Sequence, residues 1–435
     1  MERIPTGRAR FGVLILVLAA IAAPGVADEV VVFPDANLEA AVRCQLGIPA
    51  PAPIMADDML NLTCLGVDLQ PLLVSDLAGL EYAVNLEWME CAFQAVSDIS
   101  PLSHLANLEK LNLRRCRIVH IPKLSGLAAI RKVSLRENRI EDISGLANLA
   151  TLEELDLARN PISQLPEMGG LTGLTELFLD NCQVTNISAL GDLSNLTYLS
   201  ILNNNVHDVA PLAGLAFLEE LALTGNPVSD LAPLASSSSL RRLDAEYCDI
   251  NDLTPLSGLT ELQLLSVSGN PISDLSPLAA LYGLSCLSVG NNLLTDLSPI
   301  EGLSQLRMLA IVGSSVENID CLSSLTELSF FNANDCLVSH IGCLSSVTDL
   351  EFILLRNNQI SDISSLSAMG NLREVDLRGN PLNQEAYDVY IPQILANNPG
   401  VCLRYDPIPE PSVLSLMSMF GVIRFASKRR RRRRS

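Results

Sequence analysis

The chain has 435 residues and a formal net charge of -20, and aromatic residues make up only 4% of it. Eight of its 29 basic residues lie in the last twelve positions, so the body of the chain is more acidic than the total indicates. A body this acidic repels the phosphate backbone, which argues against a nucleic-acid partner.

The first 27 residues are typical of a secretory signal peptide. Three arginines precede an apolar run over residues 11–23, and Gly25-Val26-Ala27 offers a small-x-small cleavage site. Basic, apolar and small residues in this order predict export. We expect the mature chain to begin near Asp28.

Residues 28–85 are predicted to form an N-terminal cap. The stretch from Val32 to Arg43 predicts an amphipathic helix that begins after Pro34. An open stack of repeats needs such a cap for solubility. A degenerate repeat follows the helix and keeps the spacing of the later repeats with Val67, Leu69, Val74, Leu77 and Leu80.

Fourteen consecutive blocks of 22 residues then run without insertion or deletion, the first starting at Leu86 and the last at Leu372. With the first residue of a block as position 0, positions 3, 5 and 10 are apolar in every block. Positions 3 and 5 predict a short strand, and the spacing of three at positions 13, 16 and 19 predicts a tight helical or extended return. One block cannot bury its own apolar edge, so neighbouring blocks must stack.

Position 8 carries a small side chain that turns inward where the chain leaves the strand. An amide there can satisfy backbone groups of the adjacent turn, and cysteine can substitute as a small, weakly hydrogen-bonding residue. This structural ladder comprises Asn138, Asn160, Cys182, Asn204, Asn226, Cys248, Asn270, Asn292, Cys336, Asn358 and Asn380, preceded by Cys116.

The consensus L-x-x-L-x-L-x-x-N/C-x-I-x-D-I-x-P-L-x-x-L-x-x resembles the leucine-rich repeat family, in its 22-residue internalin-like bacterial form. The resemblance implies an α/β repeat solenoid, right-handed and curved, with a parallel β-sheet on the concave face and short helical or extended turns on the convex face. We assign residues 86–383 to these repeats. The last repeat merges into a C-terminal cap of residues 384–407, with a helix over 384–396 and an extended piece over 399–405.

Residues 408–435 resemble a PEP-CTERM sorting signal. Pro409-Glu410-Pro411 is followed by an apolar segment, residues 412–426, and then by Lys428 and six arginines. The resemblance implies recognition and removal by an exosortase, transient anchoring in the inner membrane, and delivery to the cell surface or extracellular matrix. The apolar segment is fifteen residues long and contains Arg424, whereas a full span needs about 20 residues, so insertion is expected to be shallow or tilted.

Two surface patches, both expected on the concave face, are candidate ligand-binding sites. The first is basic, and it could bind an anionic ligand such as an acidic polysaccharide or an acidic protein surface. The alternative is a solvated face that is balanced by Glu109, Glu137, Glu153 and Glu154. The basic residues are Lys110, Arg114, Arg115, Lys132, Arg136 and Arg159.

The second patch is an apolar column at position 2 of five successive blocks. Contiguous exposed apolar surface often marks an interaction site. The alternatives are a ladder that merely stiffens the sheet, or a face covered by the C-terminal tail. The column contains Leu264, Cys286, Met308, Phe330 and Phe352, with Val312 and Leu354 beside it.

An aspartate recurs at position 12 of the blocks. Calcium prefers oxygen ligands, but one carboxylate in each turn is typical of a side chain that caps the following turn. The four histidines are scattered, and no phosphate loop or nucleophile elbow is present. We therefore predict no catalytic residue, no cofactor and no metal site. The aspartates are Asp98, Asp142, Asp208, Asp230, Asp252, Asp274, Asp296 and Asp362.

The eleven cysteines fall into separate groups. Those of the ladder, with Cys91, are expected to be buried and inert. Cys321 and Cys343 lie 22 residues apart, at a spacing that brings alpha carbons of adjacent turns within disulfide range. We predict a bridge between them, and a second bridge between Cys44 and Cys64, in an oxidising exported location.

These features together favour a non-enzymatic binding protein. It would hold a protein or polysaccharide on its concave face at the cell surface or in the matrix. The alternatives are a structural component of the extracellular matrix and a membrane-anchored periplasmic adaptor.

Overall fold

The computed structural model describes residues 29–66 and 73–407. The predicted signal peptide, Val67 and Leu69 of the degenerate repeat, and the predicted sorting signal with Pro409, Glu410 and Pro411 lie outside these residues. The chain divides into an N-terminal unit, residues 1–138, and a C-terminal unit, residues 139–435.

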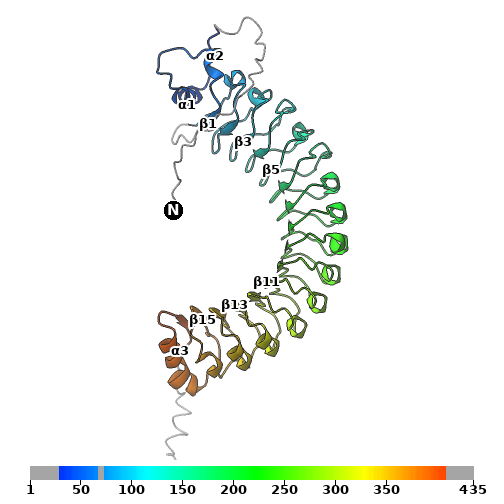
Figure 1. The fold of residues 1–435 in the computed structure, drawn as a ribbon, viewed down its shortest axis with the longest axis vertical. Coiled ribbons are helices and arrows are strands. Elements are labelled where there is room, and N and C mark those ends of the chain that lie inside the picture. Colours follow the sequence, from blue (N-terminus) through cyan, green and yellow to red (C-terminus); the bar gives the residue numbers. More distant parts are fainter. Residues whose placement is uncertain (1–28, 67–72, 408–435) are drawn as a thin grey trace, which may run out of the picture. The chain divides into compact units, whose positions relative to one another are not determined.

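The N-terminal unit contains two helices and a four-stranded parallel sheet (Figure 1). Each strand pairs with the next one along the chain. The elements are α1 (Ala36–Leu46), α2 (Ala56–Met59), β1 (Cys64–Gly66), β2 (Trp88–Glu90), β3 (Lys110–Asn112) and β4 (Lys132–Ser134), with 3-10 helices at Leu80–Tyr82 and Ser100–Leu102.

Helix α1 is the predicted capping helix, and its first turn is held by Asp35. One carboxylate oxygen of Asp35 accepts hydrogen bonds from the backbone N–H groups of Asn37 (2.9 Å) and Leu38 (3.0 Å). The other oxygen accepts from the backbone N–H of Ser75 at 2.7 Å. Burial alone would raise the pKa of Asp35, but the hydrogen bonds from Ser75, Leu38 and Asn37 hold that pKa below its usual value. This carboxylate therefore ties the cap to the degenerate repeat.

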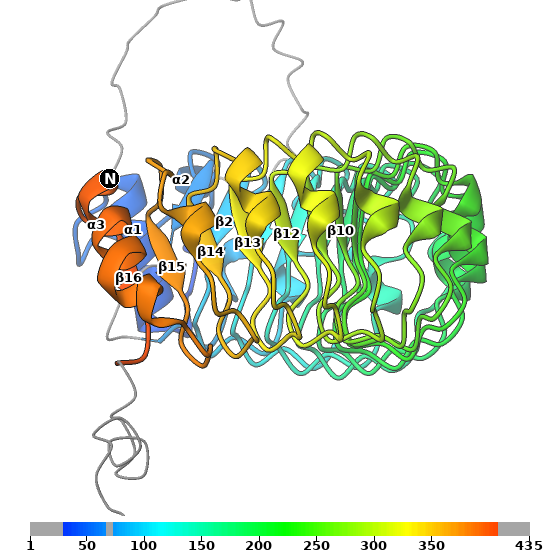
Figure 2. The ribbon, with the colours of Figure 1, turned by 90° about the horizontal axis from the view of Figure 1, so that it is seen from below.

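The C-terminal unit is a twelve-stranded parallel sheet in which neighbours in sequence are neighbours in space. Its strands line the inner side of the curved unit, and short helices lie on the outer side (Figures 1 and 2). The strands are β5 (Glu154–Asp156), β6 (Glu176–Phe178), β7 (Tyr198–Ser200), β8 (Glu220–Ala222), β9 (Arg242–Asp244), β10 (Leu264–Ser266), β11 (Cys286–Ser288), β12 (Met308–Ala310), β13 (Phe330–Asn332), β14 (Phe352–Leu354), β15 (Glu374–Asp376) and β16 (Cys402–Arg404).

The return segments of this unit are short 3-10 helices, as the spacing of three predicts. Many of them begin with a proline at the first or second position, where the missing N–H costs nothing. Their bounds are Ser144–Leu146, Ser188–Asp192, Ala210–Gly214, Ala232–Ser236, Thr254–Leu256, Ser276–Leu278, Ser298–Ile300, Asp320–Ser324, Gly342–Ser346 and Ser364–Leu366.

The closing helix differs from the continuous helix expected over residues 384–396. It opens as a π-helix, Ala386–Tyr390, and continues as α3, Ile391–Asn397. Pro392 stands at the start of α3 and has no N–H to donate, so the backbone hydrogen-bond pattern changes at this point. Strand β16 then pairs with β15, within the predicted extended piece.

The core is a continuous aliphatic stack. In the block that begins at Leu284, the seven apolar positions are all at most 1% exposed. Burying one such side chain stabilises the fold by about 1.5–3 kcal/mol before chain entropy is counted. Ser237 breaks the pattern: it is 2% exposed, and its hydroxyl has no hydrogen-bond partner. Position 19 of the block that begins at Leu218 therefore holds a polar side chain, where the adjacent blocks hold leucine.

The ladder residues join each coil to the one before it. Asn292 donates to the carbonyl oxygens of Val267 in the preceding coil (3.0 Å) and Val289 in its own (2.9 Å). Its side-chain oxygen accepts from the backbone N–H of Ile272 at 3.1 Å. The prediction of an inward amide that satisfies the adjacent turn is thus confirmed. Cysteine in this column keeps the bond to the preceding coil, as Cys336 does with Ile311 at 3.2 Å.

The aspartates of position 12 cap the turn that follows them. Each accepts a hydrogen bond of 2.8 Å from the backbone N–H two residues later. In Asp252 and Asp274, the side-chain hydroxyl two residues on, and then its backbone N–H, lower the pKa of the carboxyl. The capping interpretation is therefore confirmed.

Replacement of a ladder amide should destabilise the stack. Asn292→Ala leaves one buried N–H and two buried carbonyl groups without their partner, so we expect a loss of about 2–4 kcal/mol in the free energy of unfolding. Asn292→Cys keeps one donor, as in the natural cysteine coils, and should lose clearly less. Urea denaturation followed by circular dichroism measures both values, and equal losses would contradict the role given to the amide.

Candidate functional site

The strand register assembles the predicted apolar column. Leu264, Cys286, Met308, Phe330 and Phe352 are successive register partners on β10 to β14, and we call them the apolar strip. The middle residue of each strand is buried, so the strip lies on the open face of the sheet.

The strip is accessible and contains an aromatic pair. The side chain of Met308 is 44% exposed, and the other four members are half-buried. The ring centroids of Phe330 and Phe352 lie 6.1 Å apart at an interplanar angle of 40°. Leu354, which follows Phe352 on the same face of β14, is also half-buried. The backbone positions of these apolar residues are fixed, because each residue belongs to a hydrogen-bonded strand.

Acidic side chains gather on the same sheet face beside the apolar strip. Arg242 on β9 is paired with Asp244, with a nitrogen to oxygen distance of 2.8 Å. The carboxylates of Asp180 and Glu246 accept hydrogen bonds from Ser200 and Ser266, whose side chains stand on the following strands. We define the acidic strip as Glu176, Asp180, Glu220, Asp244 and Glu246.

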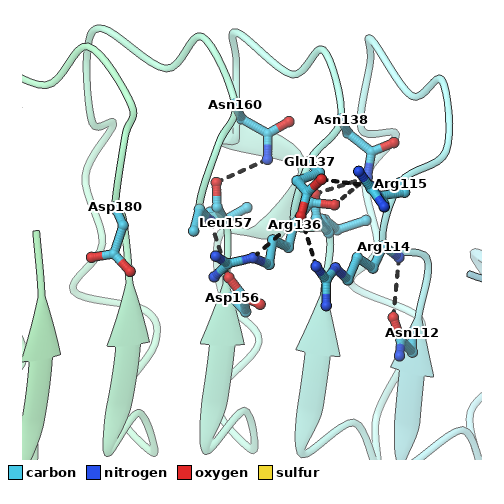
Figure 3. Close-up of polar contacts among 12 residues, drawn as sticks. Asn112, Arg114, Arg115, Arg136, Glu137, Asn138, Asp156, Leu157, Asn160 and Asp180 are labelled. Carbon is cyan, nitrogen blue, oxygen red and sulfur yellow. Dashed lines mark hydrogen bonds and ion pairs between the residues drawn. The ribbon is translucent and has the colours of Figure 1, made fainter. Parts of the chain in front are cut away.

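The predicted basic site is partly neutralised from within. In the N-terminal unit three arginines converge on Glu137, whose side chain is 14% exposed (Figure 3). The nitrogen to oxygen distances are 2.8 Å from Arg114, 2.6 Å from Arg115 and 3.7 Å from Arg136. We call these four residues the arginine cluster. Its internal carboxylate agrees with part of the balanced-face alternative.

The two predicted lysines stand together on adjacent strands. Lys110 on β3 and Lys132 on β4 are register partners, and both side chains are exposed. Trp88, which is 38% exposed, precedes them in the same column on β2. Arg159 lies in the C-terminal unit, where its side chain is exposed and its backbone N–H donates to the carbonyl oxygen of Asp180 at 2.7 Å. The other five predicted basic residues lie in the N-terminal unit, as three arginines around Glu137 and two lysines in register.

Position 7 of the blocks carries a signal that the apolar pattern does not reveal. All fourteen residues in this column have a positive φ, between 50° and 75°. Glycine and asparagine suit that conformation, whereas a bulky side chain costs about 1–2 kcal/mol there. Bulky residues nevertheless occupy the column at Phe93, Arg115, Glu137, Arg159 and Tyr247.

Two of these residues present aromatic rings that the sequence analysis missed. Phe93 is 47% exposed, and the guanidinium carbons of Arg114 and Arg115 lie 5.7 and 5.3 Å from its ring centroid. Tyr247 is 63% exposed and lies against Gly269, where an added Cβ would stand 2.6 Å from its ring. Departure from Gly or Asn just before the ladder residue is the signal that could have found both.

The thiols are free in the structure. Cys91 and the ladder cysteines are buried, as predicted, and burial raises the pKa of Cys116 and of Cys182 to about 11. Burial also raises the pKa of Cys321 to about 12, with the nearby Cys343 thiol as the next cause.

Neither predicted disulfide is tested by the fold. Cys44 is exposed, and the sulfur of Cys64 accepts a hydrogen bond from Gln45 at 3.0 Å. The pair formed by Cys321 and Cys343, with Cys343 donating to the carbonyl of Ile319 at 3.2 Å, likewise stays a prediction.

Among residues 29–66 and 73–407, no group of three or more His, Cys, Asp or Glu side chains could hold a metal ion. Over the same ranges, every helix is too short or too polar to cross a membrane. The predicted sorting segment lies outside them.

Comparison with known proteins agrees with the repeat architecture. A family model described as "Leucine Rich repeats (2 copies)" matches residues 172–214 and 238–280, and one described as "Leucine rich repeat" matches residues 106–162. A search of the curated proteins found no match.

Among solved structures, an internalin (inlF) from Listeria monocytogenes is 30% identical, with a TM-score of 0.67, over 79% of this chain and 96% of that chain. A leucine-rich repeat protein from Leptospira interrogans is 19% identical, with a TM-score of 0.67, over 80% and 97% of the two chains. The functional domain of InlJ from Listeria monocytogenes, described as including a cysteine ladder, is 20% identical, with a TM-score of 0.62, over 80% and 81%.

Differential alkylation tests which cysteines are buried and which are bridged. At pH 7.5 we expect Cys116 and Cys182 to resist iodoacetamide in the folded protein, because burial blocks the reagent and a pKa of about 11 leaves only about one thiol in 3,000 as thiolate. In exported protein, Cys321 and Cys343 should be recovered as one bridged pair in a peptide map without reductant.

Cys402, which is exposed, is the internal control and should be alkylated rapidly. Rapid labelling of the ladder thiols before unfolding would contradict their burial. Recovery of Cys321 and Cys343 as free thiols from exported protein would remove the predicted bridge.

Proposed function

Because the chain belongs to the leucine-rich repeat family, we propose that it is a non-enzymatic binding protein that holds a protein partner on the sheet face of its C-terminal unit. The observation that supports this most directly is the apolar strip, which crosses five adjacent strands. At the usual strand spacing the strip is about 19 Å long. Contiguous accessible apolar surface of this extent is typical of an interaction site.

The chemistry of the strip favours a protein over a sugar. Phe330, Phe352 and Met308 are anchors of the kind that dominate protein interfaces, because they bury much area for few rotatable bonds. Their positions are set by parallel strands whose coils are joined through the ladder. Little ordering of the site is then needed when a partner binds, which lowers the entropic cost of association.

We propose the arginine cluster with Lys110 and Lys132 as a second site, for an anionic group such as an acidic polysaccharide. Supporting it are two exposed lysines that are register partners on adjacent strands, in the same unit as the three guanidinium groups around Glu137. Guanidinium groups suit planar anions.

We also propose export, with an exosortase-type enzyme acting on residues 408–435 before the protein reaches the cell surface or matrix. The proposal depends on the order of Pro409-Glu410-Pro411, the apolar segment and the basic end, together with the signal peptide. Transient anchoring in the inner membrane would occur through the apolar segment.

Partner capture tests the binding site. Immobilised wild-type protein and the double variant Phe330→Ser/Phe352→Ser are compared for proteins retained from the host envelope. We expect the double variant to lose at least about tenfold in retained partner, since two central anchors are removed. The free energy of unfolding should change by only about 1 kcal/mol for each substitution, because both side chains lie on the open face.

Phe217→Ser is the matched control, because Phe217 is 60% exposed and lies outside the strands. Unchanged capture by the double variant would exclude the apolar strip and favour a matrix component without a specific ligand. Loss of capture on charge reversal at Arg114 and Arg136 would instead assign the partner to the arginine cluster.

Processing is tested in the native host by intact mass and cell fractionation. We expect the wild-type protein to lose about 25 C-terminal residues, since an exosortase would remove the tail at its Pro-Glu-Pro end, and to appear outside the inner membrane. Replacement of Pro409, Glu410 and Pro411 by alanine should block both events. A full-length chain that stays in the membrane fraction would contradict sorting and point to an anchored periplasmic adaptor.

A further inference from the structure

The sheet face of the C-terminal unit carries a group of apolar side chains and a group of carboxylates, one after the other along the unit. Counted back from β16, the ion pair of Arg404 and Glu374 comes first, on β16 and β15, and the apolar strip follows on β14 to β10. The acidic strip comes next, on and just after β9 to β6, where Arg242 and the ring pair of Phe178 and Tyr198 stand among its carboxylates. A ligand that lay along this face from its C-terminal end would therefore meet apolar side chains and then carboxylates.

The C-terminal tail of the same chain has the complementary chemistries in the same order. Residues 412–426 are mostly apolar, and Lys428 with six arginines follows them. We propose that this tail docks on the sheet face of its own unit, with its apolar segment on the apolar strip and its basic run on the acidic strip. The inference rests on the proposed function, because the tail would occlude the partner site until it is removed or displaced.

The starting point and length of the tail fit this placement. A carboxylate oxygen of Asp406 accepts a hydrogen bond from the backbone N–H of Gly379 at 2.5 Å, so the described chain ends beside the last coil. Two strand spacings, about 10 Å, separate β16 from β14. Residues 408–411 can cover about 13 Å when extended.

The apolar segment is then long enough to cross its strip. Fifteen residues reach from about 22 Å in a helix to about 50 Å when extended, and the apolar strip is about 19 Å long. Lys428 follows two residues after this segment. The basic run would therefore begin near β9, where the acidic strip begins.

Charge complementarity favours the basic run as the occupant of the acidic strip. No lysine or arginine occurs between residues 160 and 240, so the coils that carry Glu176 and Glu220 supply no cation of their own. Arg242 is engaged with Asp244 at 2.8 Å. Seven positive charges brought to this face would offset its carboxylates, and salt would weaken that attraction.

Tethering favours the tail over a separate partner of similar chemistry. A segment joined to the unit by a few residues is present at an effective concentration of the order of millimolar. A second copy of the chain or an envelope protein at micromolar concentration would compete poorly with it. The face would become available to such partners after the tail is cut.

Carbodiimide cross-linking tests the docking, because Lys428 is the only lysine in residues 139–435. The reagent joins an amine to a carboxylate that contacts it. We expect the full chain, purified from a host that leaves the tail in place, to give cross-linked peptides that join Lys428 to Asp244, Glu246 or Glu220, the carboxylates on or beside β9 and β8. Lys428→Arg is the matched control, since it keeps the charge and removes the amine.

Further conditions decide between occupants. Phe330→Ser/Phe352→Ser should lower the cross-link yield by about fivefold or more, and 0.5 M NaCl should lower it in the wild type. Cross-links confined to pairs of labelled and unlabelled chains in an isotopically mixed sample would overturn docking in cis and identify a second copy. Cross-links absent, or spread over carboxylates on the outer side of the unit, would also overturn the proposal.

The cross-linking experiment and the partner-capture experiment can fail independently of each other. Partner capture through the strip with no cross-link from Lys428 would refute the docking and leave the binding function intact. Specific cross-links together with unchanged capture by the double variant would support the docking and refute the binding site.

Discussion

The architecture depends on one constraint: the polar backbone groups that become buried between neighbouring coils must find hydrogen-bond partners. A single inward side chain supplies these partners. The amide of Asn292 donates to a carbonyl group of its own coil and to one of the preceding coil, and it accepts from one N–H of that preceding coil. An amide has both donors and an acceptor in a small volume. With that link in place the aliphatic positions stack without gaps, and the 22-residue spacing admits no insertion. The turns are held separately, by aspartates that bond to the backbone two residues on.

Such a scaffold leaves the open face of the sheet free to vary. Strand positions 2 and 4 point away from the core, so their side chains can change without disturbing the stack. In the C-terminal unit this freedom produces an acidic strip beside an apolar strip. In the N-terminal unit it produces two lysines in register at position 2, while the three arginines and Glu137 stand just after the strands, at positions 6 and 7. The proposed binding sites therefore use positions that the fold does not specify.

Much of the fold could be predicted from the sequence, because the same apolar pattern recurs in fourteen blocks. The strands, the inward ladder and the capping aspartates all follow from periodicity, and so does the alignment of Leu264 with Phe352. The π-helix before Pro392 did not follow, because a proline near a helix start changes hydrogen bonding without changing the apolar pattern. The convergence on Glu137 and the ring of Phe93 were also missed. Both depend on the left-handed backbone of position 7, which leaves no trace in hydropathy.

Ser237 has a mechanical consequence. It stands just before β9, where the acidic strip meets the apolar strip, and its buried hydroxyl lacks a partner. Adjacent coils place leucine at this point, so apolar contact between coils is weaker here than in a coil that has its full set of aliphatic side chains. A pulling force along the C-terminal unit would meet less resistance at this coil than at a coil with leucine. Separation there would change the spacing between the two strips, while the coils on either side kept their own register.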